Sequence, residues 1–64
     1  MRNRIPELRA ARGMTQGQLA EALDVSRQTV SSLEKGRYDP SLPLAFRISR
    51  LFALPIEQIF SDDD

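Results

Sequence analysis

Two helix-start patterns, at Thr15 and at Ser26, constrain the fold of this chain more than any other feature. Thr15 is followed by Gln18 at the spacing of a capping box, in which each side chain binds the backbone N–H of the other residue. Met14 and Leu19 bracket Thr15 at the spacing of a hydrophobic staple, and valines bracket Ser26 in the same way. The sequence therefore predicts two consecutive helices that meet across a tight turn.

The two predicted helices each have one apolar side. The first ends near Asp24, and the second runs from about Arg27 to Lys35 before Gly36. Ala20 lies where the helices would cross, and its small side chain permits a close approach. The residues expected to be buried are Leu19, Leu23, Val25, Val30 and Leu33. This is the arrangement of a helix-turn-helix, whose second helix enters the DNA major groove with its N-terminus first.

The rest of the chain also reads as helical, and no segment alternates in the manner of a strand. We expect a first helix over about 5–12, a fourth over about 42–52 after a cap at Ser41, and a short fifth over 56–60. The prediction is an all-α fold, a compact five-helix DNA-binding domain over residues 1–61. The last residues, 62–64, are expected to be an acidic disordered tail.

Composition excludes several classes of function. The chain has no cysteine and no histidine, so it lacks thiol nucleophiles, disulfides and the commonest general base and metal ligand. It also has no clustered acidic pair, and we therefore expect no enzyme activity, no metal and no cofactor. No apolar run approaches the ~20 residues that span a bilayer, and no hydrophobic region follows Arg2 and Arg4. These observations predict a cytoplasmic protein that binds no membrane.

The zero net charge conceals an asymmetry along the chain. Residues 1–37 carry seven basic and four acidic side chains, a balance of +3, whereas residues 38–64 carry two basic and five acidic ones, a balance of −3. A basic front half permits binding to a polyanion without proving it.

The polar side of the second motif helix suits base recognition. Arg27 can bond guanine bidentately and Gln28 can bond adenine, while serines can serve bases or phosphates. Thr15 and Ser26 are principally helix caps, each worth ~1 kcal/mol, and any phosphate contact from them is secondary. A phosphate could also bind at the N-terminus of the first motif helix.

These residues make the chain resemble the Cro/CI-type (xenobiotic-response-element) helix-turn-helix regulators, and more narrowly their short single-domain subgroup. The matching stretches are Leu8-Arg9, Met14-Thr15-Gln16, Leu19-Ala20, Val25-Ser26-Arg27-Gln28-Thr29-Val30, Leu33-Glu34-Lys35-Gly36 and Pro40-Ser41-Leu42, within a resemblance over roughly residues 4–60. The resemblance implies a homodimer that binds a roughly palindromic operator on double-stranded DNA, usually repressing and sometimes activating transcription.

The resemblance also implies roles for individual residues. Those expected to face bases or phosphates are Thr15, Gln16, Ser26, Arg27, Gln28, Thr29, Ser31, Ser32, Lys35, Arg37 and Tyr38. Gln16 would contact a phosphate, and Arg9 and Glu34 would form a structural ion pair beneath the motif. Asp24 departs from the family, which usually has glycine there, although aspartate tolerates a left-handed backbone at some cost. Some short relatives end in strand-forming residues, whereas this chain ends in aspartates, so no terminal sheet is expected.

Two alternatives stay open at this point. The C-terminal apolar residues either complete the core of the monomer or form a two-fold dimer interface, for which the candidates are Leu54, Ile56, Ile59 and Phe60. The alternative function is a protein-interaction module, such as an antitoxin that sequesters a toxin through its C-terminal surface. The sequence shows no site for a small-molecule effector.

Overall fold

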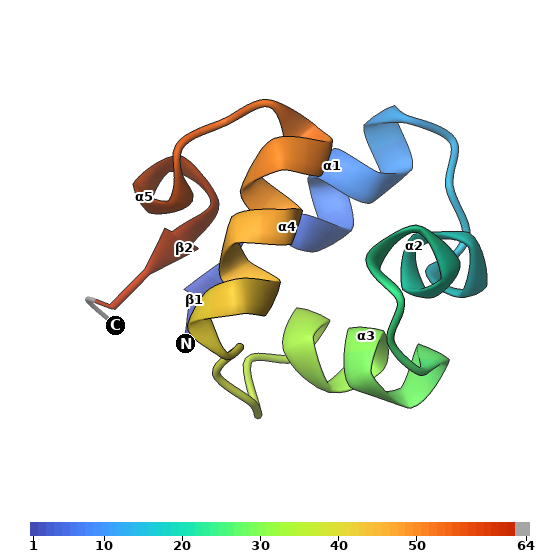
Figure 1. Cartoon of the computed structure of the whole chain (residues 1–64), viewed down its shortest axis with the longest axis horizontal. Helices are drawn as coiled ribbons and strands as arrows, with labels where there is room; N and C mark the ends of the chain where they lie inside the picture. Colours follow the sequence, from blue (N-terminus) through green and yellow to red (C-terminus); the bar gives the residue numbers. More distant parts are fainter. Residues whose placement is uncertain (63–64) are drawn as a thin grey trace.

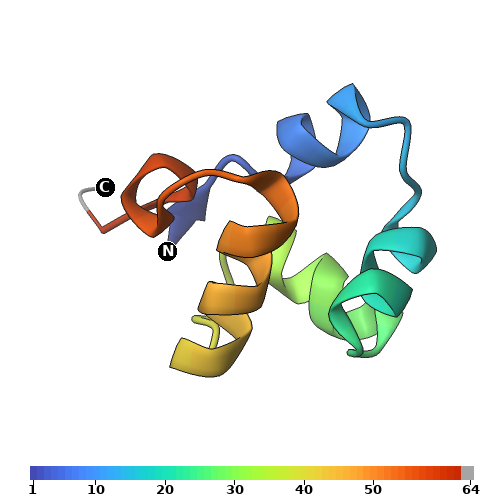
Figure 2. The ribbon, with the colours of Figure 1, turned by 45° about the horizontal axis from the view of Figure 1, so that its top comes forward.

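The structure, a computed structural model, describes residues 1–62 and is predominantly helical. Its elements in chain order are β1 (Arg2–Asn3), α1 (Ile5–Ala11), α2 (Gln16–Leu23), α3 (Arg27–Glu34), α4 (Leu42–Phe52), α5 (Ile56–Ile59) and β2 (Phe60–Ser61). Helices α2 and α3 lie at one end of the molecule, and α5 lies with the two strands at the other (Figures 1 and 2). The predicted five helices are confirmed.

The expectation that the chain has no terminal sheet is wrong. Strand β1 pairs antiparallel with β2, with Arg2 opposite Ser61 and Asn3 opposite Phe60. Helix α5 consequently ends at Ile59, because Phe60 already has an extended backbone. Each strand is only two residues long, too short for alternation to show in the sequence. The aspartates follow the strand rather than interrupting it; Asp62 is exposed, and Asp63 and Asp64 lie outside the described residues.

The predicted helix caps are confirmed. The Thr15 hydroxyl accepts from the backbone N–H of Gln18 at 3.0 Å, and the Gln18 side chain accepts from the N–H of Thr15 at 2.8 Å. Ser26 caps α3 and Ser41 caps α4, each through its hydroxyl. The start of every helix longer than α1 is therefore fixed by a side chain close to it in sequence.

One apolar core joins all five helices and β2. Its buried members are Ile5, Leu19, Ala20, Leu23, Val30, Leu33, Leu44, Ala45, Ile48, Phe52, Ile59 and Phe60. The Arg12 guanidinium lies over the ring of one core residue, Phe52, 5.4 Å from its centre. None of the helices in residues 1–62 has the length and apolar character required to cross a membrane.

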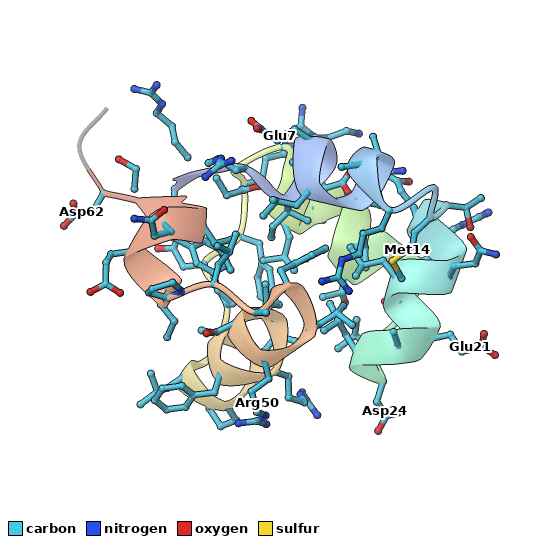
Figure 3. The ribbon with its side chains drawn as sticks, turned by 90° about the horizontal axis from the view of Figure 1, so that it is seen from above. Glu7, Met14, Glu21, Asp24, Arg50 and Asp62 are labelled. Carbon is cyan, nitrogen blue, oxygen red and sulfur yellow. The ribbon has the colours of Figure 1, made fainter. Side chains whose placement is uncertain are left out.

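Two helices end on a residue with a left-handed backbone that is not glycine. Asp24 follows α2 with φ 60°, as its position in the turn predicts, and Ala53 follows α4 with φ 55°. In Figure 3 the Asp24 side chain points away from the molecule. A left-handed backbone costs a residue with a Cβ roughly 1–2 kcal/mol. Both helix ends are therefore strained, and one of them, Ala53, carried no signal in the sequence.

Candidate nucleic-acid interface

One side of α3 is buried in the core, and the opposite side at its first turn is exposed to solvent. Val30 and Leu33 are 0% and 1% exposed and pack in the core. Arg27 and Gln28, in the first turn of α3, are exposed to solvent. Because the buried residues fix the rotation of α3, the exposed residues of its first turn project away from the core. A helix held in this way can present its N-terminal side chains to a groove.

The hydroxyl groups at the start of α3 are already engaged with each other. Ser26 accepts from the backbone N–H of Thr29 at 3.1 Å, and the two hydroxyl oxygens lie 2.9 Å apart. Both residues line a shallow polar hollow of about 310 Å³, together with Gln28, Ser32, Arg37 and Tyr38. The structure thus brings six of the predicted DNA-binding residues to one surface.

The other predicted residues lie outside this hollow. Arg27 and Lys35 are exposed at the two ends of α3, and Ser31 is half-buried. Thr15 and Gln16 lie at the start of α2, where Thr15 is occupied as a cap.

An ion pair connects α1 to α3 beneath the motif. Arg9 Nε donates to Glu34 Oε2 at 2.6 Å, Arg9 Nη2 donates to Glu34 Oε1 at 3.2 Å, and the Glu34 side chain is 7% exposed. Arg9 also donates to the Met14 carbonyl at 2.9 Å, in the loop before α2. Burial alone would raise the pKa of Glu34. The hydrogen bonds from Arg9 and Gln16 and the charge of Arg9 together outweigh this effect and bring the pKa below its ordinary value. Glu34 is therefore a stable carboxylate at neutral pH.

Gln16 is part of this network. Its Nε2 donates to Glu34 Oε1 at 2.9 Å, so one of its two amide hydrogens is already used inside the protein. The sequence assigned Gln16 only to a phosphate. The structure adds a second role, because the same side chain ties the first turn of α2 to the end of α3.

Asn3 holds the far end of α3, and sequence reasoning missed it. Its Nδ2 donates to the Leu33 carbonyl at 2.7 Å, and its Oδ1 accepts from the backbone N–H of Ile5 at 3.0 Å. Asn3 belongs to β1, so the terminal sheet anchors the helix that presents the exposed polar side chains. The only available signal was an asparagine shortly before a helix, which is a common and unspecific pattern.

Four residues in the loop directly after α3 are exposed, Lys35, Arg37, Tyr38 and Asp39, and the carboxylate of Asp39 is paired with the N-terminal ammonium group at 3.5 Å. Its backbone is fixed where it leaves the helix, because the Arg37 N–H donates to the Ser32 carbonyl at 3.1 Å and Gly36 takes the left-handed φ of 72°. Two cations and a phenol therefore stand beside the end of α3, a composition suited to phosphate oxygens.

The structure buries two of the four predicted dimer-interface residues and leaves the other two half-buried. Ile59 is 1% and Phe60 8% exposed, and both pack in the core of their own chain. For these two residues the prediction of an interface is not supported, because they have little surface left for a partner. Leu54 and Ile56 are half-buried against the core and keep part of their surface.

Comparison with known proteins identifies the family. A family model described as helix-turn-helix matches residues 5–59 of this chain. The chain belongs to the Cro/CI-type helix-turn-helix family. It is 50% identical over its whole length to an uncharacterized helix-turn-helix-type transcriptional regulator of Methanocaldococcus jannaschii, of which it covers 97%. It is 53% identical, again over its whole length, to another from Archaeoglobus fulgidus, of which it covers 91%.

Two more distant similarities are to regulators whose names state a direction of control. The helix-turn-helix-type transcriptional activator BcrR of Enterococcus faecalis is 34% identical over 95% of this chain, which covers 30% of that protein. The cryptic phage CTXphi transcriptional repressor RstR of Vibrio cholerae is 27% identical over 97% of this chain, which covers 56% of that protein. The family and these names describe a transcriptional regulator with a DNA-binding domain rather than an enzyme.

Proposed function

We propose that this chain binds double-stranded DNA in a sequence-specific manner as a homodimer, on a roughly palindromic operator, and represses transcription there. In this proposal α3 enters the major groove with its first turn leading. The bases are read by side chains of α3, and the phosphates are held by Gln16 and by the loop after α3.

The exposed first turn of α3 is the observation that carries this proposal. Arg27 and Gln28 offer a guanidinium and an amide, the two groups that bond most selectively to guanine and adenine. Small side chains follow them on the same helix, at Ser31 and Ser32, and these leave room for α3 to lie deep in a groove.

Phosphate contacts are proposed for residues that flank α3 on both sides. Lys35, Arg37 and Tyr38 follow it, and the free amide hydrogen of Gln16 lies at the start of α2. The +3 balance of residues 1–37 agrees with this assignment, since seven basic and four acidic side chains occupy the part of the chain that contains the motif. Such contacts position a protein on DNA and weaken with added salt.

Repression is the simplest consequence of occupying an operator, because it requires no further contact with the transcription machinery. The named repressor RstR and the named activator BcrR are both similar to this chain. A reporter gene placed behind the operator distinguishes the two directions: repression predicts lower expression when the chain is present, and higher expression contradicts it.

The test of the proposed function is selection of bound duplexes from a random double-stranded DNA library at near-physiological salt. The expected result is an inverted repeat with half-sites about one helical turn apart. Enrichment of no sequence, with weak binding that disappears as salt rises, would contradict specific recognition.

A further inference from the structure

The N-terminal segment, residues 1–3, lies against the end of α3 and the loop that follows it (Figure 1). The Asn3 amide donates to the Leu33 carbonyl at 2.7 Å, and the Met1 ammonium group donates to the Gly36 carbonyl at 3.0 Å. The same ammonium group lies 3.5 Å from a carboxylate oxygen of Asp39. A Cβ at Gly36 would lie 3.1 Å from the Met1 carbonyl oxygen, so the two backbones are closely packed.

We infer that this segment positions the loop after α3 for binding to DNA phosphates, with Asn3 and the Met1 ammonium group as the positioning groups. The inference deepens the proposed function and rests on it. In the proposed function Lys35, Arg37 and Tyr38 contact the phosphates, and residues 1–3 act on DNA only through them.

The first contribution of the segment is order in the loop. Arg37 and Tyr38 are exposed, and an exposed loop moves unless other parts of the molecule hold it. The Met1 ammonium group holds the backbone at Gly36, directly before Arg37, and its ion pair with Asp39 holds the loop two residues after Arg37. A loop that is ordered before binding loses less entropy when it binds, which raises affinity without any new contact.

The second contribution is charge. Lys35 and Arg37 bring two positive charges to the loop and Asp39 brings one negative charge, a balance of +1, which the Met1 ammonium group raises to +2. The ion pair is open to solvent, since the Asp39 side chain is 69% exposed, and such pairs contribute little to folding. Their field nevertheless acts on phosphates over a Debye length of about 10 Å at 0.1 M salt. We therefore expect this charge to affect DNA binding more than folding.

The terminal sheet holds the segment in place. Strand β1 pairs with β2, and the Arg4 N–H donates to the Ile59 carbonyl at 2.8 Å. The Asn3 side-chain oxygen accepts from the Ile5 N–H at 3.0 Å, which directs its amide nitrogen toward α3. The loop after α3 is therefore connected through residues 1–3 to the opposite end of the molecule.

Amide hydrogen exchange of the free protein tests the positioning without DNA. Asn3→Ala should speed exchange of the Gly36 and Arg37 amides by about threefold or more, because both donate to carbonyls in the last turn of α3, which Asn3 holds. Ser49→Ala removes a hydrogen bond of the same kind, from its hydroxyl to the Leu54 carbonyl at the end of α4, and is the control that leaves these two amides unchanged. Equal exchange of these amides in the two variants would overturn the inference.

Binding to the selected duplex tests the consequence for DNA. Asn3→Ala should raise the dissociation constant by about three- to tenfold without changing the selected sequence, and Ser49→Ala should stay within about twofold of the wild type. In a chain that already carries Arg37→Ala, Asn3→Ala should raise the dissociation constant by a smaller factor, because Asn3 acts through the loop. The same factor in both backgrounds would contradict the inference. A wild type that selects no duplex would mean that the proposed function had failed, whereas the exchange experiment would still decide whether the segment orders the loop.

A full chain synthesised with an acetylated Met1 tests the charge. Acetylation removes the positive charge and keeps an N–H that can donate to the Gly36 carbonyl. The dissociation constant should rise by about threefold or more at low salt, and the rise should shrink as salt is added. Asp39→Asn in the acetylated chain should restore binding, whereas Glu57→Gln, the same change of net charge at an exposed position of α5, should not. No effect of acetylation, or equal recovery with both substitutions, would contradict the local pairing.

Discussion

The two ends of this molecule use their exposed surfaces differently. The motif end, which comprises α2, α3 and the loop to Tyr38, has side-chain caps on both helices and a partly buried ion pair beneath them. Its exposed side chains are mainly polar or charged. The terminal end, which comprises α4, α5 and the two strands, exposes Leu42 and Phe46, and its four-residue helix α5 has no side-chain cap. The motif end therefore exposes mainly polar and charged side chains, whereas the terminal end exposes two large apolar side chains among charged ones.

This difference shows where the stability of each end originates. The motif end is fixed by helix caps between residues close in sequence, by the Arg9–Glu34–Gln16 network and by the bond from Asn3 to the Leu33 carbonyl. The terminal end depends on long-range pairing of β1 with β2 and on the common core. Substitutions in the core should therefore damage both ends equally, whereas substitutions in the network or in the turns should act on one end.

The largest effect is expected in the shared core. Leu33→Ala removes a side chain that is 1% exposed and should lower the free energy of unfolding by about 2–5 kcal/mol. Urea or thermal unfolding measures this loss, and Phe46→Ala, at a 47% exposed position, is the control that should change it by less than about 0.5 kcal/mol. Equal losses for the two variants would contradict the division into core and exposed apolar surface.

The next effect is specific to the motif end. Arg9→Met leaves the nearly buried Glu34 carboxylate without its cation. We expect the free energy of unfolding to fall by about 1–3 kcal/mol at neutral pH, less than for a fully buried pair, because Arg9 is 21% exposed. In the wild type the pKa of Glu34 is lowered on folding, so the stabilisation is present above the unfolded pKa of ~4.3 and is lost as pH falls through the folded value.

The pH dependence of the variant supplies the sharper comparison. Without Arg9, burial dominates and raises the pKa of Glu34, so this group should make the variant more stable, not less, as the pH falls from neutral. Unfolding measured between neutral pH and pH ~4 should therefore show a smaller difference between wild type and variant at the acidic end. A difference that stays constant over this range would show that the ion pair contributes no pH-dependent stability.

The smallest effects are gains, one at each end. Asp24→Gly in the motif end and Ala53→Gly in the terminal end both relieve a left-handed backbone, and each should raise the free energy of unfolding by up to about 1 kcal/mol. Thermal unfolding of the two single variants and the double variant measures whether the gains add. A loss of stability at either position would show that the native side chain contributes more there than the backbone strain costs.

Local sequence patterns predicted the motif end well, for physical reasons. The capping box at Thr15 and the cap at Ser26 involve residues within one helical turn, so their spacing is visible in the sequence. The pairing of Arg9 with Glu34 was available only from the family resemblance, because nothing local connects residues so far apart.

The terminal end was harder to predict because its structure depends on contacts between the two ends of the chain. Two-residue strands leave no period, so the sheet and the Asn3 bond to the Leu33 carbonyl could not be seen in advance. The burial of Ile59 and Phe60 within their own chain could not be predicted either. An apolar cluster has the same sequence pattern whether its own chain or a partner covers it.

Parallel selection of bound duplexes with wild type, Arg27→Ala and Arg37→Ala tests most directly whether α3 reads bases while the loop after it holds phosphates. Arg27→Ala should relax the preference at one base pair of each half-site and cost ~1–3 kcal/mol there. Arg37→Ala should retain the selected sequence, weaken all duplexes similarly and flatten the dependence of binding on salt. If both variants simply scaled the affinity for every duplex by the same factor, the assignment of base reading to α3 would be contradicted.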